Sequence, residues 1–166
     1  MNMRTAGIHH ITSIVGHPQE NVDFYREVMG FRLVKKTVNF DELETYHLYF
    51  GDSEANPGTI ITFFPWVEAR AGIIGDGQVG VTSYAVPEGS LKFWIDRLNS
   101  KGIVFNKTKR FNKELIEFKD PHGLKLELVE RADGENNNWE VDGITPNEAI
   151  KGFAGVVLYS SNPEET

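Results

Sequence analysis

HHITSIVGHPQENVDFYREVMGFRLVKKT, from His9 to Thr37, returns later in the chain as a second version of itself, VGVTSYAVPEGSLKFWIDRLNSKGIVFNKT, from Val79 to Thr108. The two stretches share a Thr-Ser pair, a proline ahead of a helical segment, an aromatic pair and a closing Lys-Thr. Self-similarity over such a distance indicates a chain built from repeated structural units.

Each stretch predicts a strand, a helix and a second strand. Residues 8–15 are β-branched and apolar, which favours a strand. Pro18 begins a segment with apolar residues at helical spacing, and Gly30 is placed to end it with a left-handed cap. Residues 31–38 then return as a strand.

A hairpin completes each unit, at residues 45–66 and again at residues 115–130. Asp52 aligns with Asp120 across the two hairpins, and Thr62 aligns with Glu127. Each unit is therefore β-α-β-β-β, and a four-stranded sheet must cover one face with another layer. The predicted class is α+β, with paired βαβββ modules forming a cup-shaped or barrel-like curved mixed sheet that carries its helices outside.

The repeat divides the chain into segments. We expect a first module at residues 7–66, a linker at 67–78, a second module at 79–131 and a second linker at 132–151. Residues 152–166 begin a third module, because VVLYSSNPEET echoes ITSIVGHPQEN from the first. This expectation makes the sequence either a part of a longer protein or a natural truncation.

The composition limits the classes of partner and the chemistry that the chain can have. The 166 residues are 40% hydrophobic and 25% charged, typical of a globular domain, with a net charge of -7. This acidic balance argues against nucleic-acid and anionic-membrane partners. There is no cysteine, which excludes disulfides and thiolate chemistry. Neither a signal-peptide core nor an apolar run of about 18 residues is present, so a cytoplasmic location is expected.

Several motifs resemble a known superfamily. DPHGLKLELVE, at residues 120–130, is similar to a signature of the vicinal oxygen chelate superfamily of glyoxalases, bleomycin-resistance proteins and extradiol dioxygenases. GIHHITSIVGHPQENVDFYREVMGFRLVKKTVNF, TYHLYFGD, PGTIITFFPW and VPEGSLKFW look like the N-terminal half of ring-cleaving dioxygenases that act on hydroquinones. Members of that family have four units and about twice this length.

The resemblance implies a set of metal-ligand positions on the first and last strands of each unit. These fall on His10, Thr62, Gly80 and Glu127, of which only His10 and Glu127 are good ligands. A non-heme iron(II) dioxygenase needs two histidines and one carboxylate. The family's first ligand falls on His10, and its other two would lie beyond Thr166, so Fe(II), or Mn(II) as second choice, is expected in the full-length protein. The alternative for Glu127 is a carboxylate left from duplication, now solvated or salt-bridged.

Four residues are candidates for the substrate pocket. Thr12 shares the face of His10 on an ideal strand, whereas His9 points to the opposite side and reaches the site only if the strand is bulged. His47 alternates with its neighbours in TYHLYF, which leaves open which set faces the cup. Phe64, in FFPW, serves either as an aromatic wall or as core packing.

Three functions remain open from the sequence. The first is an extradiol-type, ring-cleaving dioxygenase that takes a small hydroquinone-like or catechol-like aromatic and dioxygen, with this chain as an incomplete half. The second is a metal-free module that binds an aromatic ligand, as bleomycin-resistance proteins do. The third is a structural half that scaffolds a partner, and a homodimer is expected because a broken third unit leaves exposed strand edges.

Overall fold

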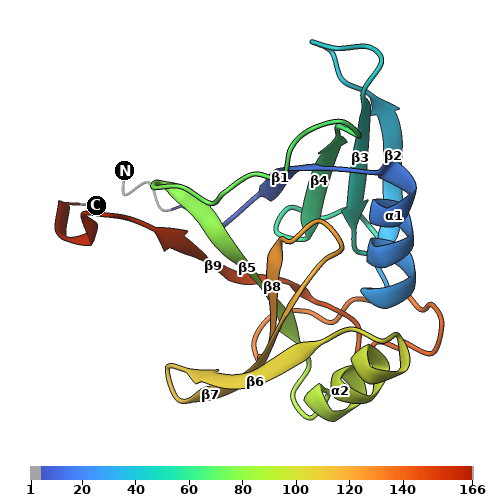
Figure 1. The fold of residues 1–166 in the computed structure, drawn as a ribbon. Helices are drawn as coiled ribbons and strands as arrows, with labels where there is room; N and C mark the ends of the chain where they lie inside the picture. The colour runs from blue at the N-terminus through green and yellow to red at the C-terminus, as the bar shows by residue number, and fades with distance from the viewer. Residues whose placement is uncertain (1–4, 166) are drawn as a thin grey trace.

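The computed structural model describes residues 5–165, and its first unit forms a four-stranded mixed sheet (Figure 1). The strand order is β1-β4-β3-β2, with β1 and β4 parallel and the other pairs antiparallel. Its elements are β1 (His10–Val15), α1 (Pro18–Asp23), the π-helical turn η1 (Phe24–Val28), β2 (Arg32–Val38), β3 (Tyr46–Gly51) and β4 (Ile60–Pro65).

The second unit forms a five-stranded sheet in the order β6-β7-β8-β5-β9. Its fifth strand, β9, comes from the segment expected to begin a third module. The elements are β5 (Gln78–Val86), α2 (Leu91–Ser100), β6 (Phe105–Arg110), β7 (Lys113–Lys119), β8 (Lys125–Glu130), β9 (Gly152–Tyr159) and the 3-10 turn η2 (Pro163–Glu165). The predicted α+β class is confirmed, and the strands lie in two mixed sheets, neither of which closes into a barrel within residues 5–165.

The first helix begins and ends where local chemistry requires. Pro18 occupies the first helical turn, where a missing N–H costs nothing. Gly30 has φ +73°, a left-handed conformation that glycine adopts without strain. Between them Tyr25 is fully buried and packs on Phe63, with ring centroids 4.5 Å apart. The helical segment thus covers the face of the first sheet that carries the core.

The two units share one hydrophobic core. Phe31 of the first unit packs against Tyr84 of the second, with ring centroids 5.3 Å apart. The Tyr25 hydroxyl donates to Asp120 Oδ2 at 3.3 Å. Burial of apolar surface, which contributes roughly 25 cal/mol per Å², therefore stabilises the contact between the units as well as each unit.

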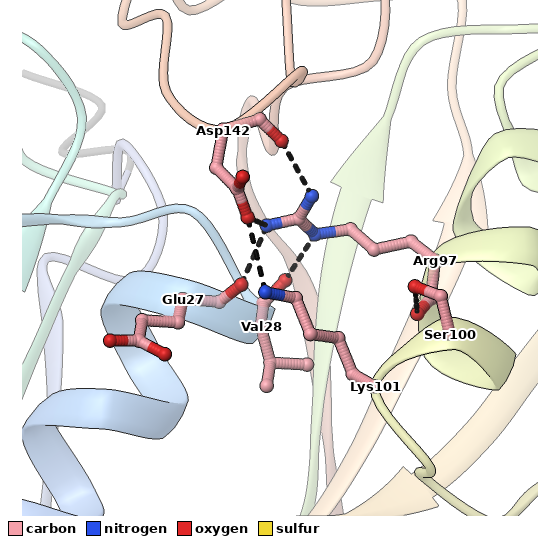
Figure 2. Close-up of polar contacts among 6 residues, drawn as sticks. All are labelled: Glu27, Val28, Arg97, Ser100, Lys101 and Asp142. Atoms are coloured by element: carbon pink, nitrogen blue, oxygen red, sulfur yellow. Dashed lines mark hydrogen bonds and ion pairs between the residues drawn. The ribbon is translucent and has the colours of Figure 1, made fainter.

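Arg97 of α2 makes the polar part of the same junction (Figure 2). Its Nε donates to the carbonyl of Val28 at 2.8 Å and its Nη2 to the carbonyl of Glu27 at 2.6 Å, both at the end of the first helical segment. Nη1 donates to the Asp142 carbonyl at 2.8 Å. A cation suits this end of a helix, whose carbonyls carry partial negative charge. The guanidinium therefore links α2, the first helical segment and the loop around Asp142.

The aligned aspartates make the same turn in both units. Asp52 Oδ1 accepts from the backbone N–H groups of Glu54 and Asn56, at 3.1 and 2.9 Å. Asp120 Oδ1 accepts from those of His122 and Leu124, both at 2.9 Å. Each aspartate accepts from the backbone N–H groups two and four residues later in the chain. The alignment of Asp52 with Asp120 therefore holds in three dimensions.

The strand registers show that the sequence alignment of the two units is wrong by one residue in the first strand. Thr12 lies opposite Thr62 between β1 and β4, and Ser83 lies opposite Glu127 between β5 and β8. The counterpart of Thr12 is therefore Ser83, and that of His10 is Val81 rather than Gly80. A register irregularity between Val79 and Val81 in the β5–β9 pair accompanies this one-residue difference.

Strand β1 ends its sheet with one edge unpaired within residues 5–165, whereas the matching edge of β5 is covered by antiparallel β9. An open strand edge presents free N–H and C=O groups that another strand can pair with. No helix in the described part of the chain is long and apolar enough to cross a bilayer.

Candidate functional site

Polar and aromatic side chains gather on the face of the first sheet that lies away from α1. Along β1 the outward set is His10, Thr12 and Ile14, and all three are exposed. On β4 the registered partner of Thr12 is Thr62, which is buried. Because strand side chains alternate between faces, these residues share one surface, opposite to core residues such as Phe63.

His10 is the exposed metal-ligand candidate on this surface. Its Nδ1 lies 3.1 Å from Nδ1 of His9, and the two rings meet edge to face. His9 precedes β1, so its ring turns toward His10 instead of pointing to the opposite side as an ideal strand predicts. A hydrogen bond at one ring nitrogen orients a histidine and leaves the other nitrogen, here Nε2, for a ligand.

His47 lies on the same surface, which settles the alternation in TYHLYF. His47 and Tyr49 face outward, whereas Leu48 and Phe50 are buried in the core. His47 Nε2 lies 3.1 Å from Thr62 Oγ1, and the Tyr49 hydroxyl lies 2.9 Å from His47 Nδ1. Thr62 Oγ1 is in turn 2.9 Å from Thr12 Oγ1. A hydrogen-bonded chain therefore crosses β3, β4 and β1.

The environment of His47 disfavours its charged form. Partial burial, followed by the positive charges of Lys35 and of His10, lowers the pKa of His47 from its ordinary value of 6.5. Lys35 Nζ also lies over the Tyr49 ring, 5.7 Å from its centroid. A neutral imidazole accepts one hydrogen bond and donates another, and its two hydroxyl neighbours can serve either role.

Phe64 supplies the aromatic wall of the surface. It is half-buried, and its ring lies 4.0 Å from that of His47 at an interplanar angle of 30°. Phe63 beside it faces the core, so the two phenylalanines of FFPW have different roles. Two adjoining rings and several hydroxyls together match the needs of a hydroxylated aromatic ligand.

Glu127 is not part of this surface. It lies on β8 of the second sheet, is fully buried and is held by Arg110 of β6. Arg110 Nη1 donates to Glu127 Oε2 at 2.7 Å, and Nη2 lies 2.6 Å from Oε1. Both carboxylate oxygens thus face a cation, which corresponds to the salt-bridged alternative for this residue. No sequence feature pointed to Arg110, because its contact depends on the register of three strands.

The ligand set is incomplete in the residues described. Residues 5–165 hold no group of three or more histidine, aspartate or glutamate side chains placed around one point. His10 has the exposure of a first ligand, but Thr62 and Val81 at matching strand positions have no ligating chemistry for iron. A facial triad would need two ligands from outside this set.

A hollow of about 650 Å³ lies elsewhere, at the junction of the units. Its walls include Phe31 and Trp139, with Arg32 and Lys101 among the charged residues. Arg32 donates to the Ser53 carbonyl and Lys101 pairs with Asp142, so these cations already have partners. The outward face of the first sheet therefore remains the better chemical candidate.

Curated proteins are similar to this chain over all or most of its length. The chain is 60% identical over all its residues to "Putative ring-cleaving dioxygenase MhqO" of Bacillus subtilis (strain 168), and it covers 53% of that protein. It is 36% identical over 90% of its length to the chlorohydroquinone/hydroquinone 1,2-dioxygenase of Sphingobium indicum, and covers 48% of that protein. The chain spans about half the length of the curated relatives it matches.

Solved structures agree. A "putative dioxygenase" from Bacillus subtilis superimposes with a TM-score of 0.95 at 60% identity, over 97% of this chain and 52% of the other. A glyoxylase/bleomycin resistance protein/dioxygenase domain from Frankia sp. EAN1pec shares the fold, with a TM-score of 0.63 at 15% identity over 80% of this chain and 96% of that one. The family model of the same name matches residues 7–128. The chain belongs to the glyoxalase/bleomycin resistance protein/dioxygenase superfamily.

Proposed function

We propose that the chain is the N-terminal half of a ring-cleaving, extradiol-type dioxygenase that acts on hydroquinone or catechol-like aromatics. In this reaction a ring C–C bond breaks and both atoms of dioxygen enter the product. The observation that carries the proposal is the exposed His10 beside a hydroxyl-lined and aromatic surface. The relatives named for ring cleavage, each about twice as long, support it.

In this proposal His10 is one of three ligands of a catalytic Fe(II), with Mn(II) as the second choice. The His9 ring orients His10 through Nδ1, which leaves Nε2 for a ligand. When bound, the metal supplies open coordination positions for substrate and dioxygen. Glu127 takes no part, because Arg110 already neutralises it.

The remaining ligands come, on this proposal, from a further unit packed beside β1. The pairing of β5 with β9 offers the pattern, since there the first strand of one unit pairs antiparallel with the first strand of the next. The open edge of β1 is available for the same pairing. Either a further unit of the same protein or a second copy of the chain meets this need, the latter giving the expected homodimer.

Substrate contacts are assigned to the chain's own side chains. Phe64 presents its ring to the aromatic ligand, with the His47 ring packed against those of Phe64 and Tyr49, and Thr12 presents a hydroxyl to the ligand's oxygen. His9 stays beside His10 rather than in the ring pocket. These contacts position the substrate and exclude water from one side of the reacting ring.

Metal placement is tested by adding substoichiometric Mn(II) to the ¹⁵N-labelled chain. Paramagnetic broadening is expected at His9, His10 and Thr12, and His10→Ala should abolish it. Glu127→Gln is the matched control and should leave the broadening unchanged. Broadening centred on Glu127, or undiminished in His10→Ala, contradicts the assignment. Ring cleavage itself is tested by oxygen uptake with hydroquinone in a protein that also carries the further units, with and without His10→Ala.

A metal-free binding module is the second candidate. The observation that favours it is the incomplete ligand set of residues 5–165, together with the neutralised Glu127. Binding of hydroquinone that is equally tight with and without Mn(II), and that survives His10→Ala, would select this alternative. A purely structural half would bind neither ligand.

A further inference from the structure

The hydrogen-bonded chain from Tyr49 to Thr12 has a property that metal ligation does not explain. It runs from the Tyr49 hydroxyl to His47, Thr62 and Thr12, with spacings of 2.9, 3.1 and 2.9 Å. It starts beneath Lys35 at one side of the surface. It ends on the strand and face of His10, two residues away.

A neutral imidazole has one N–H and one lone pair, so this chain can point in only one direction at a time. When Tyr49 donates to Nδ1, the Nε2–H of His47 donates to Thr62. Thr62 then donates to Thr12, and the Thr12 hydroxyl proton is free for a ligand. In the opposite direction Nδ1–H donates to Tyr49, Thr12 donates toward Thr62, and the Thr12 oxygen can only accept from a ligand.

The surroundings enforce this behaviour. Thr62 is 1% exposed, so water does not compete for its hydroxyl, and its side-chain partners are the two members of the chain beside it. Thr12 is exposed, so its free proton or lone pair faces outward. Partial burial and the neighbouring positive charges lower the pKa of His47, which disfavours the doubly protonated form that would break the pattern.

We propose that His47 is a positioning residue whose tautomer decides, through Thr62, whether Thr12 donates to or accepts from the hydroxyl oxygen of an aromatic ligand. This inference rests on the proposed function, since it assumes a phenolic ligand on this face. A neutral phenol donates its proton to Thr12 and selects the Nδ1–H tautomer. A phenolate accepts from Thr12 and selects the Nε2–H tautomer, so both ligand states are accommodated without charging His47.

The experiment reads the His47 tautomer by ¹⁵N NMR in the 166-residue chain with labelled histidine. The probes are hydroquinone, which is neutral at pH 7, and 4-nitrocatechol, which is ionised near neutral pH. The expected result is Nδ1–H with hydroquinone and Nε2–H with 4-nitrocatechol. Thr62→Val should leave the tautomer the same with both probes. Thr12→Val removes the hydroxyl that contacts the ligand and should weaken 4-nitrocatechol binding by about tenfold, as expected for one hydrogen bond to a charged oxygen.

Two further variants separate loss of the hydrogen-bonded chain from a general effect on folding. Thr12→Val cuts the chain at an exposed position and should make the tautomer insensitive to the probe, as Thr62→Val does, even if the buried substitution perturbs folding. Thr108→Val, at an exposed position on β6 of the other sheet, is the matched control and should change nothing. If both probes bind and the tautomer does not differ between them, the inference is wrong and the proposed function stands. If neither probe shifts resonances on this face, the inference and the proposed aromatic site fail together.

Discussion

Arg110 holds the carboxylate of Glu127 through both terminal guanidinium nitrogens, at 2.7 and 2.6 Å, and Glu127 is fully buried. The pair occupies the position in the second unit that corresponds to Thr62 in the first. The buried charge of Glu127 is therefore balanced by a cation within the sheet.

Removing Arg110 should destabilise the chain more than a surface ion pair does. Arg110→Leu leaves a buried carboxylate without its cation, and we expect a loss of about 3 kcal/mol, the lower end for buried pairs, because Arg110 is partly exposed. Urea unfolding followed by circular dichroism measures it. Lys109→Leu breaks the exposed pair with Glu114 and should cost less than about 1 kcal/mol. Equal midpoints for the two variants would contradict the assignment.

Replacing Arg97 should destabilise the chain about as much as replacing Arg110, but for a different reason. Arg97→Met removes the donors to three backbone carbonyls, at Glu27, Val28 and Asp142, at the junction of the units. Leaving such acceptors unpaired should cost about 3 kcal/mol in unfolding free energy. Asp142→Asn is the control, because it weakens only the side-chain ion pairs with Arg97 and Lys101, while the backbone carbonyl that accepts from Arg97 remains. A small effect of Arg97→Met, similar to this control, would show that the junction depends on apolar packing alone.

The titration of His47 should respond to Lys35. Because the pKa of His47 is lowered in the folded chain, its neutral form favours folding above pH 6.5, and that contribution declines as pH falls through 6.5 toward the lowered value. Lys35→Met removes a nearby positive charge and should raise the pKa, as followed by NMR. Lys36→Met is the matched control, because Lys36 lies over Tyr46, the neighbour that alternates with His47. Equal shifts in the two variants would refute the electrostatic cause.

Asp120 should make the chain less stable as pH rises. Burial is the largest influence on its carboxyl and raises the pKa above the ordinary 3.8, so the unfolded chain releases this proton first. Its contribution is present below pH 3.8 and is lost as pH rises through the higher folded value. Asp120→Asn keeps the turn's acceptor oxygen and should gain stability relative to the wild type between pH 4 and pH 7. The exposed Asp96→Asn controls for lost charge, and parallel pH profiles for wild type and Asp120→Asn would contradict the prediction.

Much of the fold could be predicted because it depends on nearby residues. Pro18 and Gly30 bound the first helical segment, as expected from their backbone preferences. Asp52 and Asp120 make matching turns, because each carboxylate bonds to its own following backbone. Such features need only a few adjoining residues, which a single sequence contains in full.

The candidate site was predictable only in part. His10 and Thr12 share a face, as strand alternation predicts. His9 departed from that pattern because it lies outside β1. Gly80 was aligned one residue away from the true counterpart of His10, since a slip of one residue exchanges the two faces of a strand. The partners Arg110 and Tyr49 went unnoticed, because nothing local distinguishes them from other surface residues.

The sequence by itself determined the repeated β-α-β-β-β units, their turns and the placement of His10 on a first strand, because these follow from periodicity and backbone preference. Only the tertiary structure decided that His47 faces outward, that Arg110 neutralises Glu127 and that β9 covers β5 while β1 keeps an open edge. Those outcomes depend on the register between strands far apart in the chain. That register is selected by the packing of a core shared between the two units, which acts on the whole chain at once.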